Sequence, residues 1–243
     1  MNEPMHRTFL VVDVENSSQL GNTELAAMRS TLYRILDEAT DRTGTVVADD
    51  DRGDGCLLVL SLPVLEVLDQ IVESVVVGVR THNHTVGPLD WMRVRVAVHE
   101  GYVHKDGRGW SSDALTATFR LNDAAVVKGT LKNAARAVGV VVISDIVYQG
   151  VVRHNYRPTV TSAEYRSVDI TTKEGPVRAW LRVPGYPEPP LPADTSAPAV
   201  AQEANPVRAV GESGSITANN MIVGDVRART IIGGDNVGGT VPA

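Results

Sequence analysis

Residues 8–18 read TFLVVDVENSS, a stretch in which a short apolar run closes on an acidic residue and a polar loop. A run of this length predicts a buried strand over residues 8–13, ending at Asp13. A second apolar run, CLLVL, begins at Cys56 directly after the turn RGDG. Two glycines and three aspartates at residues 50–55 are typical of a tight hairpin, so strands are predicted at residues 45–49 and 56–61.

Helical and strand-like patterns alternate beyond this core. Apolar residues at helical spacing predict a helix over residues 23–43, which Gly44 ends, and a second helix that begins at Pro63. The strictly alternating stretch MRVRVAVH at residues 92–99 predicts a half-buried strand, with its valines on one face and Arg93 and Arg95 on the other.

The remaining elements complete the expected fold. Residues 112–137 are predicted to be mainly helical, residues 138–143 to form another buried strand, and residues 165–171 and 177–182 to form a closing hairpin. The order β-α-β-β-α-β predicts an α+β, ferredoxin-like split βαβ sheet, with helices on one face as the economical arrangement.

Composition divides the chain into three parts. Residues 1–183 carry the alternating elements, and residues 184–206 form a Pro/Ala-rich stretch that is typical of an extended linker. Residues 207–243 form a Gly-rich tail of short β-prone pieces. A tail of this length cannot bury much surface alone, so it is either disordered or pairs with another chain.

Charge and cysteine content exclude several classes of protein. The 243 residues carry a net charge of −6, which argues against nucleic acid as a partner because phosphate backbones select basic surfaces. The single cysteine, Cys56, rules out a disulfide framework and is expected to be buried and reduced. A secretory signal and a membrane-spanning run are not expected, so the chain is predicted to be cytoplasmic.

Two carboxylates are the candidate chemical centre. Asp13 ends the first strand and Asp54 lies in the hairpin turn, and in a ferredoxin-like sheet the first strand lies beside that hairpin. Paired carboxylates at strand ends suit Mg²⁺, which prefers hard oxygen ligands and keeps water for substrate phosphates. The alternative is structural: Asp13 caps a strand end and Asp54 is a turn residue.

An ordered set of motifs resembles the class III adenylyl and guanylyl cyclases. The family's D-[IV]-x-G-F-[ST] motif is matched by residues 13–18, and its G-D hairpin by Gly53-Asp54. Its I-H-x-G strand is matched by Val98-His99-Glu100-Gly101, and its V-N-x-A-x-R-L helix by residues 115–121. Its closing K-G hairpin is similar to Lys173-Glu174-Gly175-Pro176. The resemblance spans residues 7–183 and implies a nucleotide-cyclase fold.

The resemblance also implies roles for single residues. Asp13 and Asp54 would hold two Mg²⁺ or Mn²⁺ ions, with the Val14 carbonyl as a further ligand. Arg120 would stabilise transition-state charge on the α-phosphate of a nucleoside triphosphate, and Lys173 would contact its terminal phosphates. In the family these groups come from opposite subunits of a homodimer.

Several positions depart from the family pattern. The transition-state asparagine falls on Thr116, and the two adenine-reading positions fall on Asp50 and Gly109, so adenine specificity is not expected. In the first motif the candidate substrate-binding loop reads Asn16-Ser17-Ser18, in which Ser17 replaces phenylalanine and Ser18 keeps a hydroxyl for phosphate.

Two functions stay open on the sequence. The first is an active cyclase that forms a 3′,5′-cyclic nucleotide from a nucleoside triphosphate. The second is an inactive cyclase-fold subunit that regulates or assembles a complex and docks a protein partner through its C-terminal tail.

Overall fold

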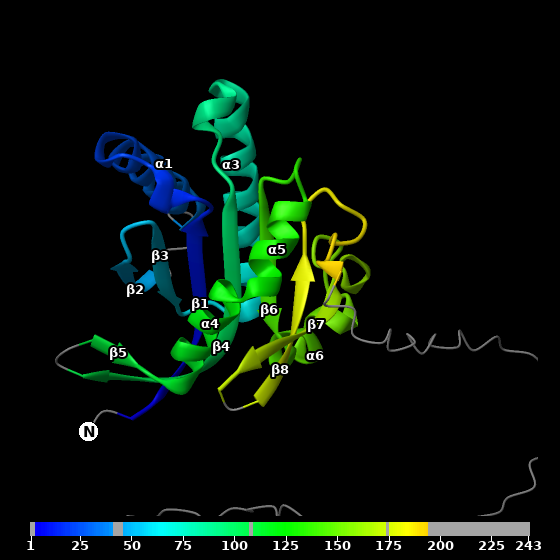
Figure 1. Cartoon of the computed structure of the whole chain (residues 1–243). Helices are drawn as coiled ribbons and strands as arrows, with labels where there is room; N and C mark the ends of the chain where they lie inside the picture. Colours follow the sequence, from blue (N-terminus) through cyan, green and yellow to red (C-terminus); the bar gives the residue numbers. More distant parts are fainter. Residues whose placement is uncertain (1–2, 41–45, 107–108, 174, 194–243) are drawn as a thin grey trace, which may run out of the picture. The chain divides into compact units, whose positions relative to one another are not determined.

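A computed structural model of the chain describes residues 3–40, 46–106, 109–173 and 175–193, which lie in the first of two compact units, Met1–Val200. The strands of this unit form one sheet (Figure 1): β1 (Met5–Val14), β2 (Val46–Asp51), β3 (Gly55–Leu60), β4 (Val94–Asp106), β5 (Gly109–Ser111), β6 (Gly139–Ser144), β7 (Arg166–Thr172) and β8 (Gly175–Arg182). The helices are α1 (Asn22–Thr40), α2 (Val64–Glu66), α3 (Glu73–Thr85), α4 (Asp113–Asp123), α5 (Ala125–Asn133) and α6 (Asp145–Gly150). No helix within the described ranges is long and apolar enough to cross a membrane.

The sheet has the order β2-β3-β1-β4-β6-β8-β7, with β5 paired to β4 outside this path. Strand β1 lies centrally and runs antiparallel to both β3 and β4. Strands β4 and β6 are parallel, and β7 and β8 form the closing hairpin. The predicted α+β class and the predicted place of the first strand beside the β2–β3 hairpin are confirmed.

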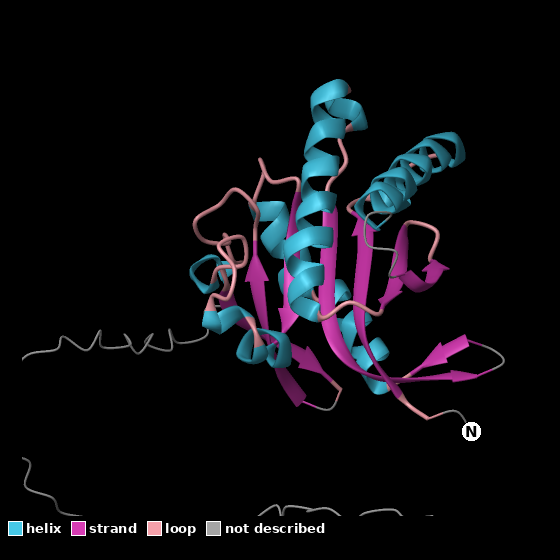
Figure 2. Ribbon diagram, turned by 180° about the vertical axis from the view of Figure 1, so that it is seen from behind, coloured by secondary structure: helices cyan, strands magenta, loops and turns pink. Residues whose placement is uncertain are grey.

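Helices cover both faces of the sheet, which corrects the expectation of helices on one face. Leu10 and Val12 of β1 belong to a core under α1 and α3, whereas Phe9 and Val11 belong to a second core under α4 and α5. Helix α3 lies in front of the strands in the view of Figure 2, and α4 and α5 lie in front of them in the opposite view of Figure 1. The reason is that β1 is apolar at successive positions, so neither of its faces can be left to water.

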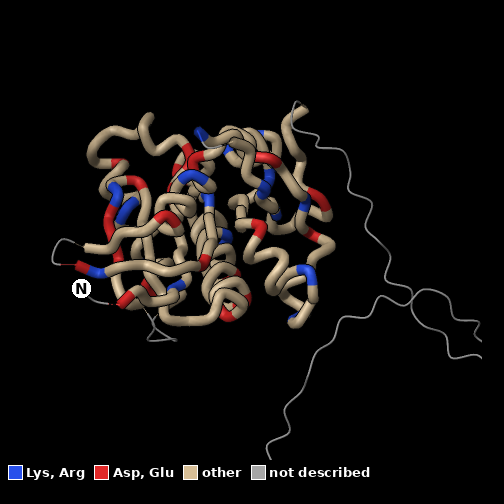
Figure 3. The backbone as a smooth tube through the Cα atoms, turned by 90° about the horizontal axis from the view of Figure 1, so that it is seen from below, with Lys and Arg blue, Asp and Glu red and all other residues tan. Residues whose placement is uncertain are grey.

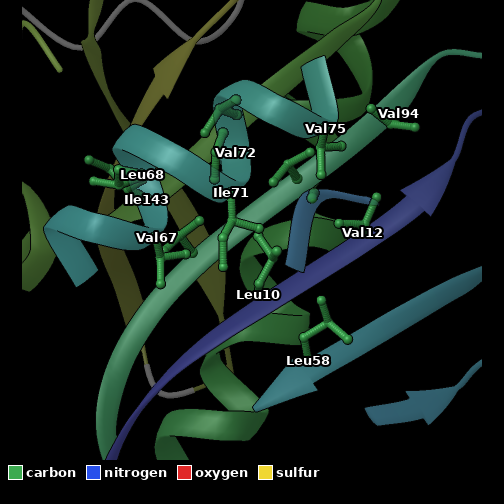
Figure 4. Close-up of a cluster of buried hydrophobic side chains, with 14 of the residues drawn as sticks. Leu10, Val12, Leu58, Val67, Leu68, Ile71, Val72, Val75, Val94 and Ile143 are labelled. Atoms are coloured by element: carbon green, nitrogen blue, oxygen red, sulfur yellow. The ribbon is translucent and has the colours of Figure 1, made fainter. Parts of the chain in front are cut away.

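The predicted second helix is one continuous segment with a wider turn inside it. A π-helical turn at Val67–Val72 joins α2 to α3. This turn places Val67, Leu68, Ile71 and Val72 in the core (Figure 4). The sequence predicted the helix that begins at Pro63, but not the π-helical turn within it.

Some element boundaries differ from the sequence prediction. Strand β2 continues to Asp51, so Asp50 lies on a strand opposite Leu57 instead of in the turn. The segment 112–137 is two helices, because Ala124 adopts an extended conformation (ψ 138°) between α4 and α5. Helix α6 has no counterpart in the prediction.

The packed unit extends beyond the predicted boundary at residue 183. Tyr186 and Leu191 pack against the core under α5. The side-chain amide of Asn133 on α5 donates to the Pro190 carbonyl at 3.2 Å. This first part of the predicted linker is therefore docked, while residues 194–206 and the predicted tail 207–243 lie outside the described residues.

Candidate functional site

Asp13 and Asp54 meet at one end of β1. Asp13 lies directly opposite Gly55 in the β1–β3 pairing. The Val14 backbone N–H donates to the Asp54 carbonyl at 3.1 Å, so the turn is joined to the strand end. The Asp54 carboxylate is close enough to contribute to a raised pKa of Asp13. The strand end and the neighbouring turn therefore bring the two predicted metal carboxylates together.

Asp13 is a poorly solvated carboxylate that forms an ion pair with Arg95. Burial is the largest cause of its raised pKa, and Arg95 and the side chain of Asn122 oppose this rise. Arg95, opposite Asp13 on β4, donates to Asp13 Oδ2 at 2.8 Å. Asp13 Oδ1 and Asn122 Oδ1 are both buried without a hydrogen-bond partner among the described residues, and the Asn122 side chain lies close enough to favour the ionised form of Asp13. Sequence reasoning did not identify Arg95 or Asn122, because their contacts depend on strand register and on the position of α4.

The loop after β1 orients Asp54. Ser17 is 6% exposed, and its hydroxyl donates to Asp54 Oδ2 at 2.6 Å. Asn16 precedes it in the left-handed conformation (φ 60°), which asparagine tolerates better than most residues. Asn16 and Ser18 are exposed. Of the three predicted loop residues, Ser17 thus contacts the Asp54 carboxylate directly.

A residue that the sequence did not point to holds the turn of Asp54. Arg29 on α1 forms a two-pronged ion pair with Asp51, and it also donates to the Gly53 carbonyl. The Gly53 N–H in turn donates to Asp51 Oδ1 at 2.8 Å. The Arg29 guanidinium holds the pKa of Asp51 well below its usual range. Arg29 lies on an otherwise ordinary polar helix face, which gave no signal of this contact.

The two predicted phosphate-binding residues share one cavity. Arg120 on α4 and Lys173 at the β7–β8 turn both line a cavity of about 750 Å³, together with Asp123, Asp169 and Thr171. Asp13 and Asp54 are not among the described residues that line it. The described lining of this cavity therefore contains the cationic pair and not the carboxylate pair.

The positions that depart from the family pattern are engaged elsewhere. Thr116 is exposed on α4, and its hydroxyl donates to the Ser112 carbonyl one turn earlier at 3.2 Å. Asp50 forms an exposed ion pair with Arg52 at 3.3 Å. Gly109 (φ 140°) begins β5, and its N–H donates to Asp106 Oδ1 at 3.0 Å. Among the described residues, neither of these contacts joins Asp50 to Gly109.

His99, from the third matched motif, has a structural role in the sheet. It is 7% exposed, and its Nδ1 lies 2.7 Å from Ser144 Oγ at the end of the adjacent strand β6. Burial, with a smaller effect of His6, lowers the pKa of His99 to about 4. His99 is therefore neutral near pH 7 and tethers β4 to β6.

The donor set fits a divalent cation. The carboxylates of Asp13 and Asp54 offer hard oxygen ligands at the end of β1. The buried Asp13 Oδ1 has no hydrogen-bond partner among the described residues, and a cation could fill that place. Arg95 takes the other oxygen of Asp13 and leaves Oδ1 for an ion. The described residues contain no cluster of three or more His, Cys, Asp or Glu side chains that could hold a metal ion, so further ligands would come from the backbone, water or substrate.

No protein-family model and no curated protein matches the sequence. Solved structures do match. The adenylate/guanylate cyclase/hydrolase from Silicibacter pomeroyi aligns with a TM-score of 0.55 at 20% identity, over 75% of this chain and 98% of that one. A bacterial light-regulated adenylyl cyclase aligns with a TM-score of 0.51 at 11% identity, over 74% of this chain and 90% of that one. The guanylyl cyclase domain of the RhoGC fusion protein from Blastocladiella emersonii aligns with a TM-score of 0.50 at 14% identity, over 74% of this chain and 98% of that one.

Proposed function

The chain has the fold of adenylate/guanylate cyclase catalytic domains, and we propose that it is a nucleotide cyclase. The single observation that carries the proposal is the meeting of Asp13 and Asp54 at the end of β1, with a buried Asp13 oxygen left unpaired. The proposed substrate is a nucleoside triphosphate, and the products are a 3′,5′-cyclic nucleotide and pyrophosphate.

In the proposed reaction the ribose 3′-oxygen forms a bond to the α-phosphorus. The bond between the α-phosphorus and the bridging oxygen breaks, pyrophosphate leaves with the electron pair, and the hydroxyl proton passes to solvent. A Mg²⁺ or Mn²⁺ ion held by Asp13 and Asp54 would favour the deprotonated 3′-oxygen and neutralise phosphate charge. A second ion, which the family resemblance implies, would need most of its ligands from water and the substrate phosphates.

The side chains around this centre have distinct parts in the proposal. Ser17 fixes the Asp54 carboxylate, and Arg95 fixes that of Asp13 and favours its ionised form. Arg120 donates to the oxygens of the α-phosphate, where negative charge develops, and Lys173 binds the terminal phosphates. The Thr116 hydroxyl offers one weaker donor where the family has an amide.

The proposed enzyme is a homodimer. Arg120 and Lys173 line a cavity whose described lining includes neither Asp13 nor Asp54. We propose that the two pairs come together across the dimer, where Asp13 and Asp54 of one copy meet Arg120 and Lys173 of the other. This arrangement agrees with the shared sites that the family resemblance implies.

The base is proposed to be guanine or a pyrimidine. Asp50 is acidic where the adenine-reading lysine is expected, and it is paired with Arg52. Gly109 has no side chain to act as the partner of that lysine. Both positions therefore lack the groups that would select adenine.

The test is product formation by the purified full-length chain with Mn²⁺ and each of ATP, GTP, CTP and UTP. Mass spectrometry should detect a 3′,5′-cyclic product, and Asp54→Ala should abolish it. If no triphosphate yields a cyclic product, or if Asp54→Ala forms it equally well, the proposal is wrong. The non-catalytic subunit would then be the remaining alternative.

A mixing experiment tests the shared site. Asp54→Ala and Arg120→Ala should each be inactive alone. A mixture that is unfolded and refolded together should recover about a quarter of wild-type activity, because half of the dimers are mixed and each has one intact site. A mixture that stays inactive, while wild-type protein refolds to full activity, would contradict the dimer.

A further inference from the structure

A second cavity lies apart from the residues discussed above. It forms where α3, the connection between α5 and β6, and the chain after β8 come together. Its volume is about 500 Å³, and it is lined by Arg80, Arg136, Val138, Pro184, Gly185 and Tyr186. The proposed catalytic residues are not among these lining residues.

The two arginines of this cavity differ from the others in the described ranges. Charged residues of both signs are interspersed along the chain (Figure 3), and the other described arginines each have a hydrogen bond, an ion pair or a ring contact. The guanidinium groups of Arg80 and Arg136 have none among the described residues. No aspartate or glutamate is found in the described lining of the cavity.

The walls around these arginines are held by the backbone. Pro184 and Gly185 (φ 88°) occupy the centre of a tight turn, which the hydrogen bond from Tyr186 N to the Val183 carbonyl closes at 3.0 Å. The Arg136 backbone N–H donates to the Tyr186 hydroxyl at 3.2 Å. The cavity is therefore a fixed feature of three chain segments, in which the guanidinium groups remain available.

The chemistry of the lining indicates the ligand. Two like charges in one cavity without a carboxylate repel each other, and a dianion removes this repulsion. The planar fork of arginine matches phosphate oxygens, which it binds with two parallel hydrogen bonds. The Gly185 N–H forms no hydrogen bond with described residues and adds a donor to the lining. Val138, Pro184 and the Tyr186 ring provide an apolar wall for an organic group.

We propose that this cavity binds a small phosphate monoester through Arg80 and Arg136. The site is separate from the carboxylate pair and does not depend on the proposed cyclase activity. It would give the protein a second place at which a phosphorylated metabolite binds.

The test is a titration of the ¹⁵N-labelled full-length chain with phenyl phosphate at constant ionic strength. Binding is monitored through the chemical shifts of the backbone amides. The Gly185 and Tyr186 amides should shift. Arg80→Gln and Arg136→Gln should each weaken binding by about tenfold, the effect of losing one charge-assisted contact. Both side chains are exposed, so the remaining spectrum should show an intact fold.

A control variant separates this site from other arginines. Arg153→Gln removes an exposed arginine that donates to Gln149, and it should bind phenyl phosphate like the wild type. Unchanged affinity in Arg80→Gln and Arg136→Gln, or an equal weakening in Arg153→Gln, would overturn the proposal. Inorganic phosphate should bind more weakly than phenyl phosphate, and equal binding would exclude the ester as the ligand.

Discussion

Acidification should destabilise the fold through His99. Burial lowers the pKa of this histidine from its ordinary value of 6.5 to about 4. As pH falls below 6.5, His99 therefore becomes protonated in the unfolded chain while it stays neutral in the folded chain. The stability that neutral His99 contributes is complete above pH 6.5 and is lost progressively towards pH 4.

The magnitude follows from the two pKa values. One unit of pKa difference corresponds to about 1.4 kcal/mol, so the full effect is about 3 kcal/mol. Between pH 7 and pH 5 the linkage relation gives a loss of about 2 kcal/mol from His99 alone. Other groups also titrate in this range, so the effect of His99 is the difference between the wild type and a variant that cannot titrate there.

The variant is His99→Gln, whose amide can still bond to Ser144 Oγ. Urea unfolding at pH 7 and pH 5 should show that the wild type loses about 2 kcal/mol more than His99→Gln. His84→Gln, which changes an exposed histidine at the end of α3, should lose as much as the wild type. Equal losses in the wild type and His99→Gln, or an NMR titration that places the pKa of His99 near 6.5, would refute the reasoning.

Three further results test the packing around the carboxylates. Arg29→Ala should weaken Mn²⁺ binding severalfold in an isothermal titration, because the turn that carries Asp54 loses its contact with α1. Arg34→Ala on the same helix should have no effect on Mn²⁺ binding. Equal effects of the two variants would exclude a positioning role for Arg29. Gly55→Ala should lower the free energy of unfolding by about 1–3 kcal/mol, because its methyl group would lie 2.4 Å from the Val12 carbonyl oxygen; an unchanged urea midpoint would contradict this. Mn²⁺ binding should weaken as pH falls through the raised pKa of Asp13, since the ion needs the ionised form, and pH-independent binding would contradict that ligand.

The parts of the fold that the sequence predicted are those set by local patterns. Apolar runs and turn residues were enough to place β1, β3 and the turn of Asp54. The two-sided covering of the sheet was missed, although the unbroken run of apolar residues in β1 is itself the sign of a strand buried on both faces. Helix α6 was missed because it is short and has no long periodic pattern.

The candidate site was predictable only in part. The sequence pointed to Asp13 and Asp54 because Asp13 lies near the end of a recognisable strand and Asp54 lies in a recognisable turn. Arg95 and Ser144 contact their partners through strand register, and Arg29 reaches the turn through the packing of α1. None of these contacts leaves a mark in the local sequence, because each depends on residues far apart along the chain.

The proposed activity depends on Asp13 and Asp54 jointly binding one divalent cation. The most direct measurement is a titration of the full-length chain with Mn²⁺. Binding is monitored as the decrease of the free-ion signal in electron paramagnetic resonance. Asp13→Asn and Asp54→Asn should each weaken binding by about tenfold or more, while Asp50→Asn, an exposed residue on the neighbouring strand, should bind like the wild type. Wild-type affinity in both Asp13→Asn and Asp54→Asn would contradict the account.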